Sequence, residues 1–290
     1  MRLAFLGTPE AAVPSLAALV DAGHEVVLVV TGPDRRRGRG REISASPVKR
    51  AAMERDLVVS HRLDDVAEVQ LECAIVVAYG AIVSSALLTR VPMLNVHFSL
   101  LPRWRGAAPV QRAILAGDEE TGVTIISLEP ALDTGPVHLE RRTRTLNKSA
   151  SELTHELALL GAQAIVEVLA TPALLHHPRA QVGEATYARK ISKEMLRLSH
   201  EMDVTTASRT VRLGGAFAMV GQRRLGVVSA RASTAAPGDG VVALVDHDVL
   251  LGFRGGSLIL DEVRPEGSHT MGAREWWSGQ RAPGGGVSWS

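Results

Sequence analysis

The chain has 290 residues, which is enough for two domains, because domains commonly contain about 100–200 residues. Apolar residues make up 46% and charged residues 22%, so a sizeable core can be buried and global disorder is excluded. The single cysteine, Cys73, excludes an internal disulfide and any zinc site built from several thiolates. No run approaches about 18 uninterrupted apolar residues, and no signal-peptide pattern precedes the first predicted strand. We therefore expect a cytoplasmic protein with no membrane association.

Charge is distributed unevenly along the chain. Lys and Arg total 32 and Asp and Glu total 31, so the formal net charge is only +1. The segment 35–50 nevertheless holds seven basic residues and one acidic residue, whereas the segment from 201 to the end holds nine of each sign. A polyanionic partner is thus indicated by one loop and not by the whole chain.

The first half of the sequence alternates between predicted strands and helices. Two strands flank an amphipathic helix within the first thirty residues and form a βαβ unit. Continuous apolar runs of the kind found in buried strands follow. Over 151–169 apolar residues recur at helical spacing, which predicts a helix. The predicted strands are Arg2–Gly7, Glu25–Thr31, Ala74–Ala78, Met93–His97 and Val123–Leu128. This order predicts an α/β domain with a doubly wound, Rossmann-like, mostly parallel sheet.

The pattern changes after residue 179. A polar, basic stretch is followed by short β-like runs separated by turns such as APGDG and RGG, which favour a small, OB-like β-barrel. We predict a catalytic domain over 1–180, a basic linker over 181–199, a C-terminal barrel over 200–280 and a disordered tail over 281–290.

Candidate catalytic residues lie where a doubly wound sheet places its ligands, at the carboxyl ends of its strands. No dinucleotide fingerprint and no Walker-type loop occurs, which disfavours an NAD enzyme and a P-loop NTPase. Asn95 and His97 are two residues apart on a predicted strand and share a face, where an amide and an imidazole can bind a carbonyl oxygen and move a proton. Asp133, in the run LDTG, is placed to orient the imidazole. Spacing alone is a weak argument, because a single His or an Asp-Thr-Gly turn is usually structural.

The run NVHFSLLPRWRGAAPVQRAILAGDEETGVTI, with LDTG after it, closely resembles the methionyl-tRNA formyltransferase family. The similarity continues in FLGTPEAAVPSL, GPDRRRGRGREISASPVK, VVAYG, ATYARKISKE and VRPEGSHTM, and it spans residues 2 to about 280. The resemblance implies transfer of a formyl group from 10-formyltetrahydrofolate to the amino group of methionine on initiator tRNA. It also implies a monomer that needs no metal.

The resemblance assigns roles to particular residues. It implies that Asn95 and protonated His97 stabilise a tetrahedral oxyanion, and that Asp133 holds His97 and takes up the amine proton. It places folate binding at the run SLLP and tRNA contacts at the arginine loop, with Arg39 at the key position and a continuation in the basic linker. The folate residues are Ser99, Leu100, Leu101 and Pro102, and the tRNA residues are Arg35, Arg36, Arg37, Arg39, Arg41, Arg189, Lys190 and Lys193.

Two other functions remain open at this point. A formyltransferase acting on an amino sugar or sugar nucleotide would keep the same catalytic residues, and the absence of a net charge on the C-terminal segment favours it. A non-catalytic folate- or RNA-binding paralogue is disfavoured, because a binding module needs no titratable trio.

Overall fold

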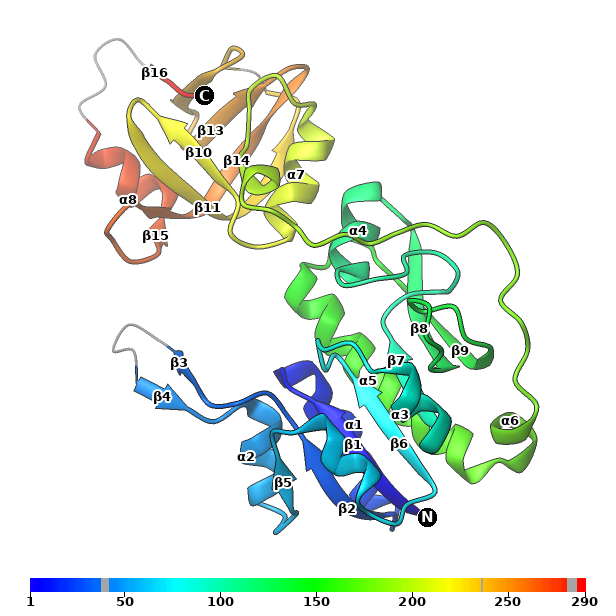
Figure 1. Ribbon diagram of the computed structural model, residues 1–290. Coiled ribbons are helices and arrows are strands. Elements are labelled where there is room, and N and C mark those ends of the chain that lie inside the picture. The colour runs from blue at the N-terminus through cyan, green and yellow to red at the C-terminus, as the bar shows by residue number, and fades with distance from the viewer. Residues whose placement is uncertain (38–41, 236, 281–285) are drawn as a thin grey trace. The chain divides into compact units, whose positions relative to one another are not determined.

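The computed structural model describes residues 1–37, 42–235, 237–280 and 286–290 (Figure 1). The chain divides into two compact units. The first unit consists of Met1–Val110, Glu119–Leu146 and Glu152–Arg189, and the second consists of Gln111–Asp118, Asn147–Ser151 and Lys190–Ser290. The first unit therefore extends beyond the boundary that we predicted at residue 180.

The first unit contains a seven-stranded sheet in the order β5-β2-β1-β6-β7-β8-β9 (Figure 1). The pairs from β5 to β7 are parallel, and β8 and β9 are added in antiparallel pairs. The strands are β1 (Arg2–Gly7), β2 (Glu25–Val30), β5 (Val59–Ser60), β6 (Cys73–Val77), β7 (Met93–His97), β8 (Glu120–Ser127) and β9 (Val137–Arg144). This arrangement confirms the predicted Rossmann-like, mostly parallel sheet.

Helices cover the sheet and bury its apolar strands. They are η1 (Glu10–Ala12), α1 (Val13–Asp21), α2 (Pro47–Met53), η2 (Leu63–Ala67), α3 (Ser85–Arg90), α5 (Ala150–Ala170) and α6 (Pro172–His176). Helix α4 (Pro109–Ala116) belongs mostly to the second unit. The hydroxyl groups of Ser46 and Ser84 accept backbone N–H bonds at the starts of α2 and α3, as helix N-caps do. The central strands are almost completely buried, so the sheet forms the core of this unit.

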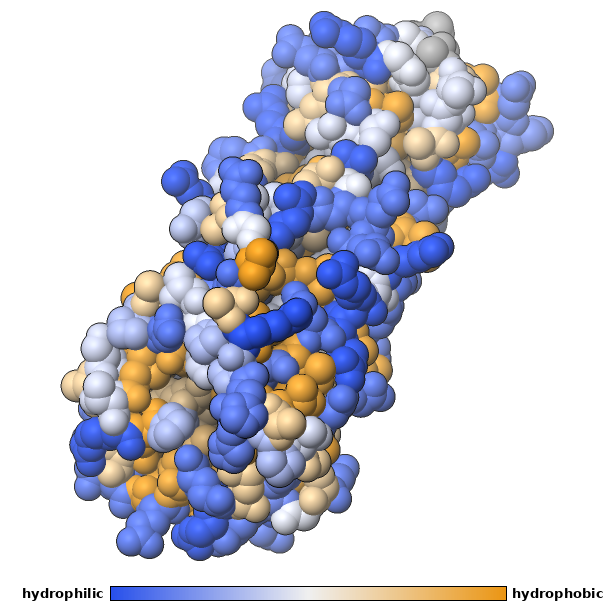
Figure 2. All heavy atoms as spheres, turned by 90° about the vertical axis from the view of Figure 1, so that its right-hand side faces the viewer, coloured by the Kyte–Doolittle hydropathy of each residue, from blue (hydrophilic) through white to orange (hydrophobic). Residues whose placement is uncertain are grey.

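Helix α5 passes the length and composition criteria for a membrane span, the only helix to do so among the described residues. Half of its most apolar window is buried inside the protein, and core helices of soluble proteins meet the same criteria. Hydrophilic side chains cover much of the molecular face drawn in Figure 2, with apolar patches between them.

The arginine-rich segment forms a hairpin of β3 (Arg35–Arg37) and β4 (Glu42–Ser44). Its base is closed by a buried hydrogen bond of 2.7 Å between the Thr31 and Ser46 hydroxyls and by an ion pair of 2.8 Å between Lys49 and Asp34. The hairpin therefore leaves the sheet from a fixed base.

The second unit is an antiparallel sheet in the order β10-β11-β14-β13-β12-β16, with β15 paired to β14. Its strands are β10 (Phe217–Val220), β11 (Arg223–Ser233), β12 (Val241–Val245), β13 (Asp248–Phe253), β14 (Gly256–Pro265), β15 (Met271–Gly272) and β16 (Gly286–Ser288). Helices η3 (Glu194–Leu196), α7 (Val204–Arg212) and α8 (Ala273–Ser278) complete it. Two backbone hydrogen bonds of 2.8 and 2.9 Å join Met219 to Ser290 and connect the two ends of the sheet. The predicted barrel-like second domain is thus confirmed.

The prediction of a disordered tail over 281–290 is wrong for its last five residues. Strand β16 pairs with β12, and Trp289 is only 4% exposed, with its ring 4.9 Å from that of Phe253. We based that prediction on the glycine-rich composition, which carries no information about this distant strand pairing. Residues 281–285 lie outside the described part of the chain.

The first part of the predicted linker is likewise integrated into the first unit. Thr186 and Ala188 form backbone hydrogen bonds with Pro102, Arg105, Ala107 and Ala108, at 2.7–3.2 Å. We call residues 181–188 the strap, because they run along the loop that follows β7. A polar composition suggested a free linker here, but the backbone of this segment is paired.

Candidate active site

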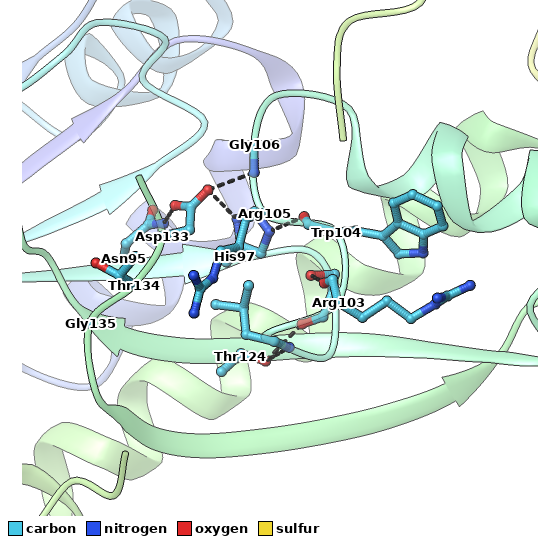
Figure 3. Close-up of polar contacts among 12 residues, drawn as sticks. Asn95, His97, Arg103, Trp104, Arg105, Gly106, Thr124, Asp133, Thr134 and Gly135 are labelled. Atoms are coloured by element: carbon cyan, nitrogen blue, oxygen red, sulfur yellow. Dashed lines mark hydrogen bonds and ion pairs between the residues drawn. The ribbon is translucent and has the colours of Figure 1, made fainter. Parts of the chain in front are cut away.

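Asn95 and His97 lie on β7, in the middle of the sheet, with exposed fractions of 9% and 6%. Side chains alternate along a strand, so both point to one face and Val96 points to the other. On that other face α5 approaches closely at Gly161, where a Cβ atom would lie 2.6 Å from a Val96 methyl group. Helix packing on one face therefore leaves the Asn95–His97 face for the site (Figure 3).

The imidazole of His97 is held from both sides. Its Nε2 atom lies 2.9 Å from the carbonyl oxygen of Trp104, which can only accept, so Nε2 carries a hydrogen. Its Nδ1 atom lies 3.7 Å from Oδ2 of Asp133 (Figure 3). Nδ1 is consequently the nitrogen that faces the carboxylate and is available to a reacting group.

Asp133 reaches the same point from the loop after β8 and is 8% exposed. Its Oδ2 accepts a hydrogen bond of 2.8 Å from the amide of Gly106, and its Oδ1 lies 3.5 Å from the Asn95 amide nitrogen. Its backbone φ is +51°, in the left-handed region, where an Asp residue is tolerated. The structure therefore brings Asn95, His97 and Asp133 together, as the sequence predicts.

The turn after Asp133 is tightly packed against β8. A Cβ atom on Gly135 would lie 1.8 Å from the carbonyl oxygen of Ser127, so only glycine fits this approach. The amide of Ser127 in turn donates to the carbonyl of Pro136 at 3.0 Å. These contacts fix the position of the turn that joins β8 to β9.

The run SLLP forms a braced loop beside His97. The Thr124 hydroxyl donates to the Ser99 carbonyl at 2.7 Å and accepts from the Leu101 amide at 3.2 Å. The Ser99 hydroxyl donates to the Arg103 carbonyl at 2.6 Å. Ser99, Leu101 and Pro102 are buried and Leu100 is partly buried, so this run is a rigid wall and the Ser99 hydroxyl is already engaged.

The candidate RNA-binding residues are placed only in part. Arg35 is exposed on β3, and Arg36 and Arg37 belong to the same strand. Arg39 and Arg41 lie outside the described residues. Of the basic residues after the strap, Arg189 ends the first unit, and Lys190 and Lys193 lie in the second. All three of these side chains are exposed.

The thiol of Cys73 does not belong to this site. β6 and β7 are parallel, and Val76 pairs with Asn95. Cys73 is the first residue of β6, so it lies near the amino ends of these strands, whereas Asn95 and His97 lie near their carboxyl ends. Burial, more than the nearby Glu72 charge, raises the pKa of the Cys73 thiol to about 11. A neutral, buried thiol is not a nucleophile at neutral pH.

Sequence reasoning missed the groups that hold the candidate catalytic residues and the SLLP loop in place. They are the Trp104 carbonyl, the Gly106 amide, the Thr124 hydroxyl and the side chain of Gln181. Only Thr124 carried a usable signal, since it lies on the next strand along the chain and pairs with His97. The backbone contacts depend on loop conformations that no residue type specifies.

Comparison with known proteins identifies the family. A formyl transferase family model matches residues 1–169, and the model of the formyl transferase C-terminal domain matches 190–281. The chain belongs to the formyl transferase family. It is therefore a one-carbon group transferase, and Asn95, His97 and Asp133 all lie within the first matched region.

The proteins and structures that are similar to this formyltransferase carry different names. The chain is 43% identical over 305 residues to a methionyl-tRNA formyltransferase of Rhizorhabdus wittichii, covering 98% of this chain and 97% of the relative. A structure of HypX from Aquifex aeolicus with tetrahydrofolic acid matches with a TM-score of 0.66 and 19% identity, covering 95% of this chain and 46% of that one. This chain thus spans about half of HypX. An N-formyltransferase from Helicobacter canadensis, in complex with folinic acid and dTDP-3-aminofucose, matches with a TM-score of 0.66 and 15% identity, covering 89% and 98%. At these identities the two structures share the fold alone.

Proposed function

We propose that this formyltransferase transfers the formyl group of 10-formyltetrahydrofolate to the amino group of methionyl initiator tRNA, as a cytoplasmic monomer that supports translation initiation. The observation that carries the proposal is the 43% identity, over nearly the full length of both chains, to a methionyl-tRNA formyltransferase. The amino-sugar enzyme, by contrast, is only 15% identical.

In this proposal Asn95 and His97 bind the oxygen of the formyl group. The bound donor supplies an activated formyl carbon. Attack by the methionine nitrogen puts negative charge on the formyl oxygen, and two donors are available for it. They are the Asn95 amide and Nδ1–H of protonated His97, because Nε2–H is already bound to the Trp104 carbonyl. Preorganised donors of this kind stabilise the charge strongly, each contributing about 10²–10³ in rate.

Asp133 has the complementary task of holding a proton. Its Oδ2 is fixed by the Gly106 amide, and among the residues that the structure describes its Oδ1 has only the long contact to Asn95. Oδ1 is thus the oxygen that takes up the proton lost by the attacking amine, directly or through a water molecule. As the intermediate collapses, the nitrogen that leaves from the folate takes up the proton that Asp133 accepted, so Asp133 becomes a carboxylate again.

The residues present fit a flat folate. Ser99, Leu100, Leu101 and Pro102 form a braced wall, held by the buried Thr124 hydroxyl. Leu132, next to Asp133, is 62% exposed and offers an apolar surface to a ring system. A rigid wall with few polar side chains suits a planar heterocycle.

The arginine hairpin and the basic residues after the strap bind the phosphates of the tRNA in this proposal. Guanidinium groups bind phosphate in a bidentate fashion, and the fixed base of the hairpin holds Arg35, Arg36 and Arg37 on one ribbon. The proposal places Arg39 and Arg41 at the RNA, and it adds Arg189, Lys190 and Lys193 as further phosphate contacts.

Formylation of an amino sugar is the second candidate. The likeness to the Helicobacter canadensis enzyme and the balance of nine basic and nine acidic residues from 201 onward favour it. The test is formyl transfer from 10-formyltetrahydrofolate to charged initiator tRNA, with an amino-sugar nucleotide assayed beside it. Transfer to the sugar alone would reject the tRNA proposal.

His97→Ala tests the catalytic site. We expect a fall in kcat of about 10²–10³ with folate binding retained, because the variant loses an oxyanion donor and keeps the SLLP wall. Folate affinity is measured by fluorescence titration, and kcat with saturating tRNA. Unchanged turnover would remove His97 from the mechanism.

Arg39→Ala tests the hairpin. Loss of one phosphate contact should weaken use of tRNA and reduce the slope of log affinity against log salt by about 1. Arg142→Ala is the matched control, since this 62% exposed arginine lies on β9, away from the hairpin sequence. An unchanged salt slope for Arg39→Ala would contradict the assigned role.

A further inference from the structure

The side chain of Gln181, in the strap, contacts both loops that hold the catalytic residues. Its Nε2 donates to the carbonyl oxygens of Asp133 and Gly135, at 2.8 and 2.9 Å. Its Oε1 accepts from Nη2 and Nε of Arg105, at 2.6 and 3.2 Å. Both hydrogens of the amide and its oxygen are therefore used.

The orientation of this amide is determined by its partners. A guanidinium group only donates and a carbonyl oxygen only accepts. A reversed amide would place its NH₂ group against Arg105 and its oxygen against two carbonyl oxygens. Gln181 therefore connects these partners in one way only.

The two partners of Gln181 lie beside the catalytic groups. Asp133 and Gly135 are the first and last residues of the turn that positions the Asp133 carboxylate. Asp133 has a backbone φ of +51°. An Asp residue is tolerated in this region but favours it less than the ordinary backbone conformations, so surrounding contacts help to hold it there. The Gln181 amide bonds the carbonyl of that residue, so it is one of the groups that enforce the conformation.

Arg105, the other partner of Gln181, belongs to the backbone segment that contacts His97 and Asp133. It lies between Trp104, whose carbonyl binds His97, and Gly106, whose amide binds Asp133. The backbone of Arg105 also pairs with Thr186 and Ala188 of the strap, at 2.8 and 2.7 Å. Gln181 thus links the segment that holds His97 to the turn that holds Asp133.

We propose that Gln181 is a positioning residue for formyl transfer, which sets the separation of the His97 imidazole and the Asp133 carboxylate without contacting the substrate. The inference rests on the proposed roles of these two residues. Because catalytic geometry is sensitive to displacements of about 1 Å, loosening this link should cost up to about 100-fold in rate.

Three variants test the proposal. Gln181→Ala removes both contacts. Gln181→Glu keeps acceptors for Arg105 but sets a carboxylate oxygen against the carbonyls of Asp133 and Gly135. Gln163→Ala is the matched control, since Gln163 is an exposed glutamine on α5 of the same unit.

We expect kcat, measured per folded molecule with saturating tRNA and folate, to fall about 10- to 100-fold in both Gln181 variants, with both KM values within about twofold of the parent. In the Asp133→Asn background, Gln181→Ala should add no further loss, because it acts through Asp133. A parental kcat for Gln181→Ala would overturn the proposal, and so would full activity of Gln181→Glu or an equal loss in the Asp133→Asn background.

A second readout does not depend on activity. The ring ¹⁵N chemical shifts of His97, assigned with His97→Gln, report on the environment of Nδ1. They should move in Gln181→Ala and stay fixed in Gln163→Ala. Unmoved shifts would refute the positioning role even in a protein that formylates neither acceptor. If the protein formylates neither acceptor but the His97 shifts move in Gln181→Ala, the proposed function is rejected and the positioning role of Gln181 is retained.

Discussion

Thr124→Val is the sharpest test of how the SLLP wall is held. Valine has nearly the shape of threonine, so the substitution removes one hydroxyl with little change in packing. That hydroxyl is completely buried, donates to the Ser99 carbonyl at 2.7 Å and accepts from the Leu101 amide at 3.2 Å. Both backbone groups would lose this partner within a buried loop.

The expected cost follows from those two groups. An unsatisfied buried donor or acceptor costs about 1–3 kcal/mol, so we expect about 2–4 kcal/mol once the loop has partly relaxed. In a unit of this size each kcal/mol lowers Tm by about 2–4 °C. If the SLLP wall binds the folate as proposed, its loosening should also raise KM for the folate while kcat changes less.

Urea unfolding followed by circular dichroism measures the stability, and initial rates at varied folate measure KM. Thr124→Ser keeps both hydrogen bonds and should recover most of the loss. Thr89→Val is the control, because the Thr89 hydroxyl donates to a carbonyl on an exposed helix surface, where we expect less than about 0.5 kcal/mol. A Thr124→Val protein as stable as the parent would refute the account of the loop.

Two further predictions concern close packing and the lone thiol. Gly135→Ala places a Cβ atom 1.8 Å from the Ser127 carbonyl oxygen, so the turn must move and kcat should fall about 100-fold; Gly272→Ala, with open space around it, should leave kcat unchanged in the same steady-state assay. The thiol of Cys73, with a pKa raised to about 11 by burial, should resist iodoacetamide at pH 8 in the folded protein and react in urea. Rapid labelling of the folded protein, detected by intact mass, would contradict the burial of this thiol.

The sheet of the first unit could be predicted because its central strands are continuous apolar runs. β7 was predicted at its exact bounds, and β1 likewise, since these sequences contain little that competes with a buried strand. β9 was missed, because its sequence VHLERRTR is the charged, half-exposed pattern of an edge strand. The second unit was recognised from its turns, but β16 depends on pairing with a strand forty residues earlier.

The residues of the candidate site could be predicted from the sequence, but the groups that hold them in place could not. Asn95 and His97 share a face by strand periodicity alone, and Asp133 was proposed from its place in the LDTG run before the family resemblance supported it. Nothing in the residues near Gln181 indicates that its amide meets Arg105 and the Asp133 turn, because the contacts join segments 48 and 76 residues apart. Such long-range polar contacts follow from the assembled fold.

The strap has a consequence for the order in which the protein can mature on the ribosome. All three candidate catalytic residues have been synthesised by residue 133, and the match to the formyl transferase family model ends at residue 169. The backbone partners of the loop after β7, however, lie at Thr186 and Ala188. A nascent chain, or a fragment ending at 169, would have the candidate catalytic residues without the segment that fixes their loops. Fragments meant to isolate the catalytic half should therefore end after 189.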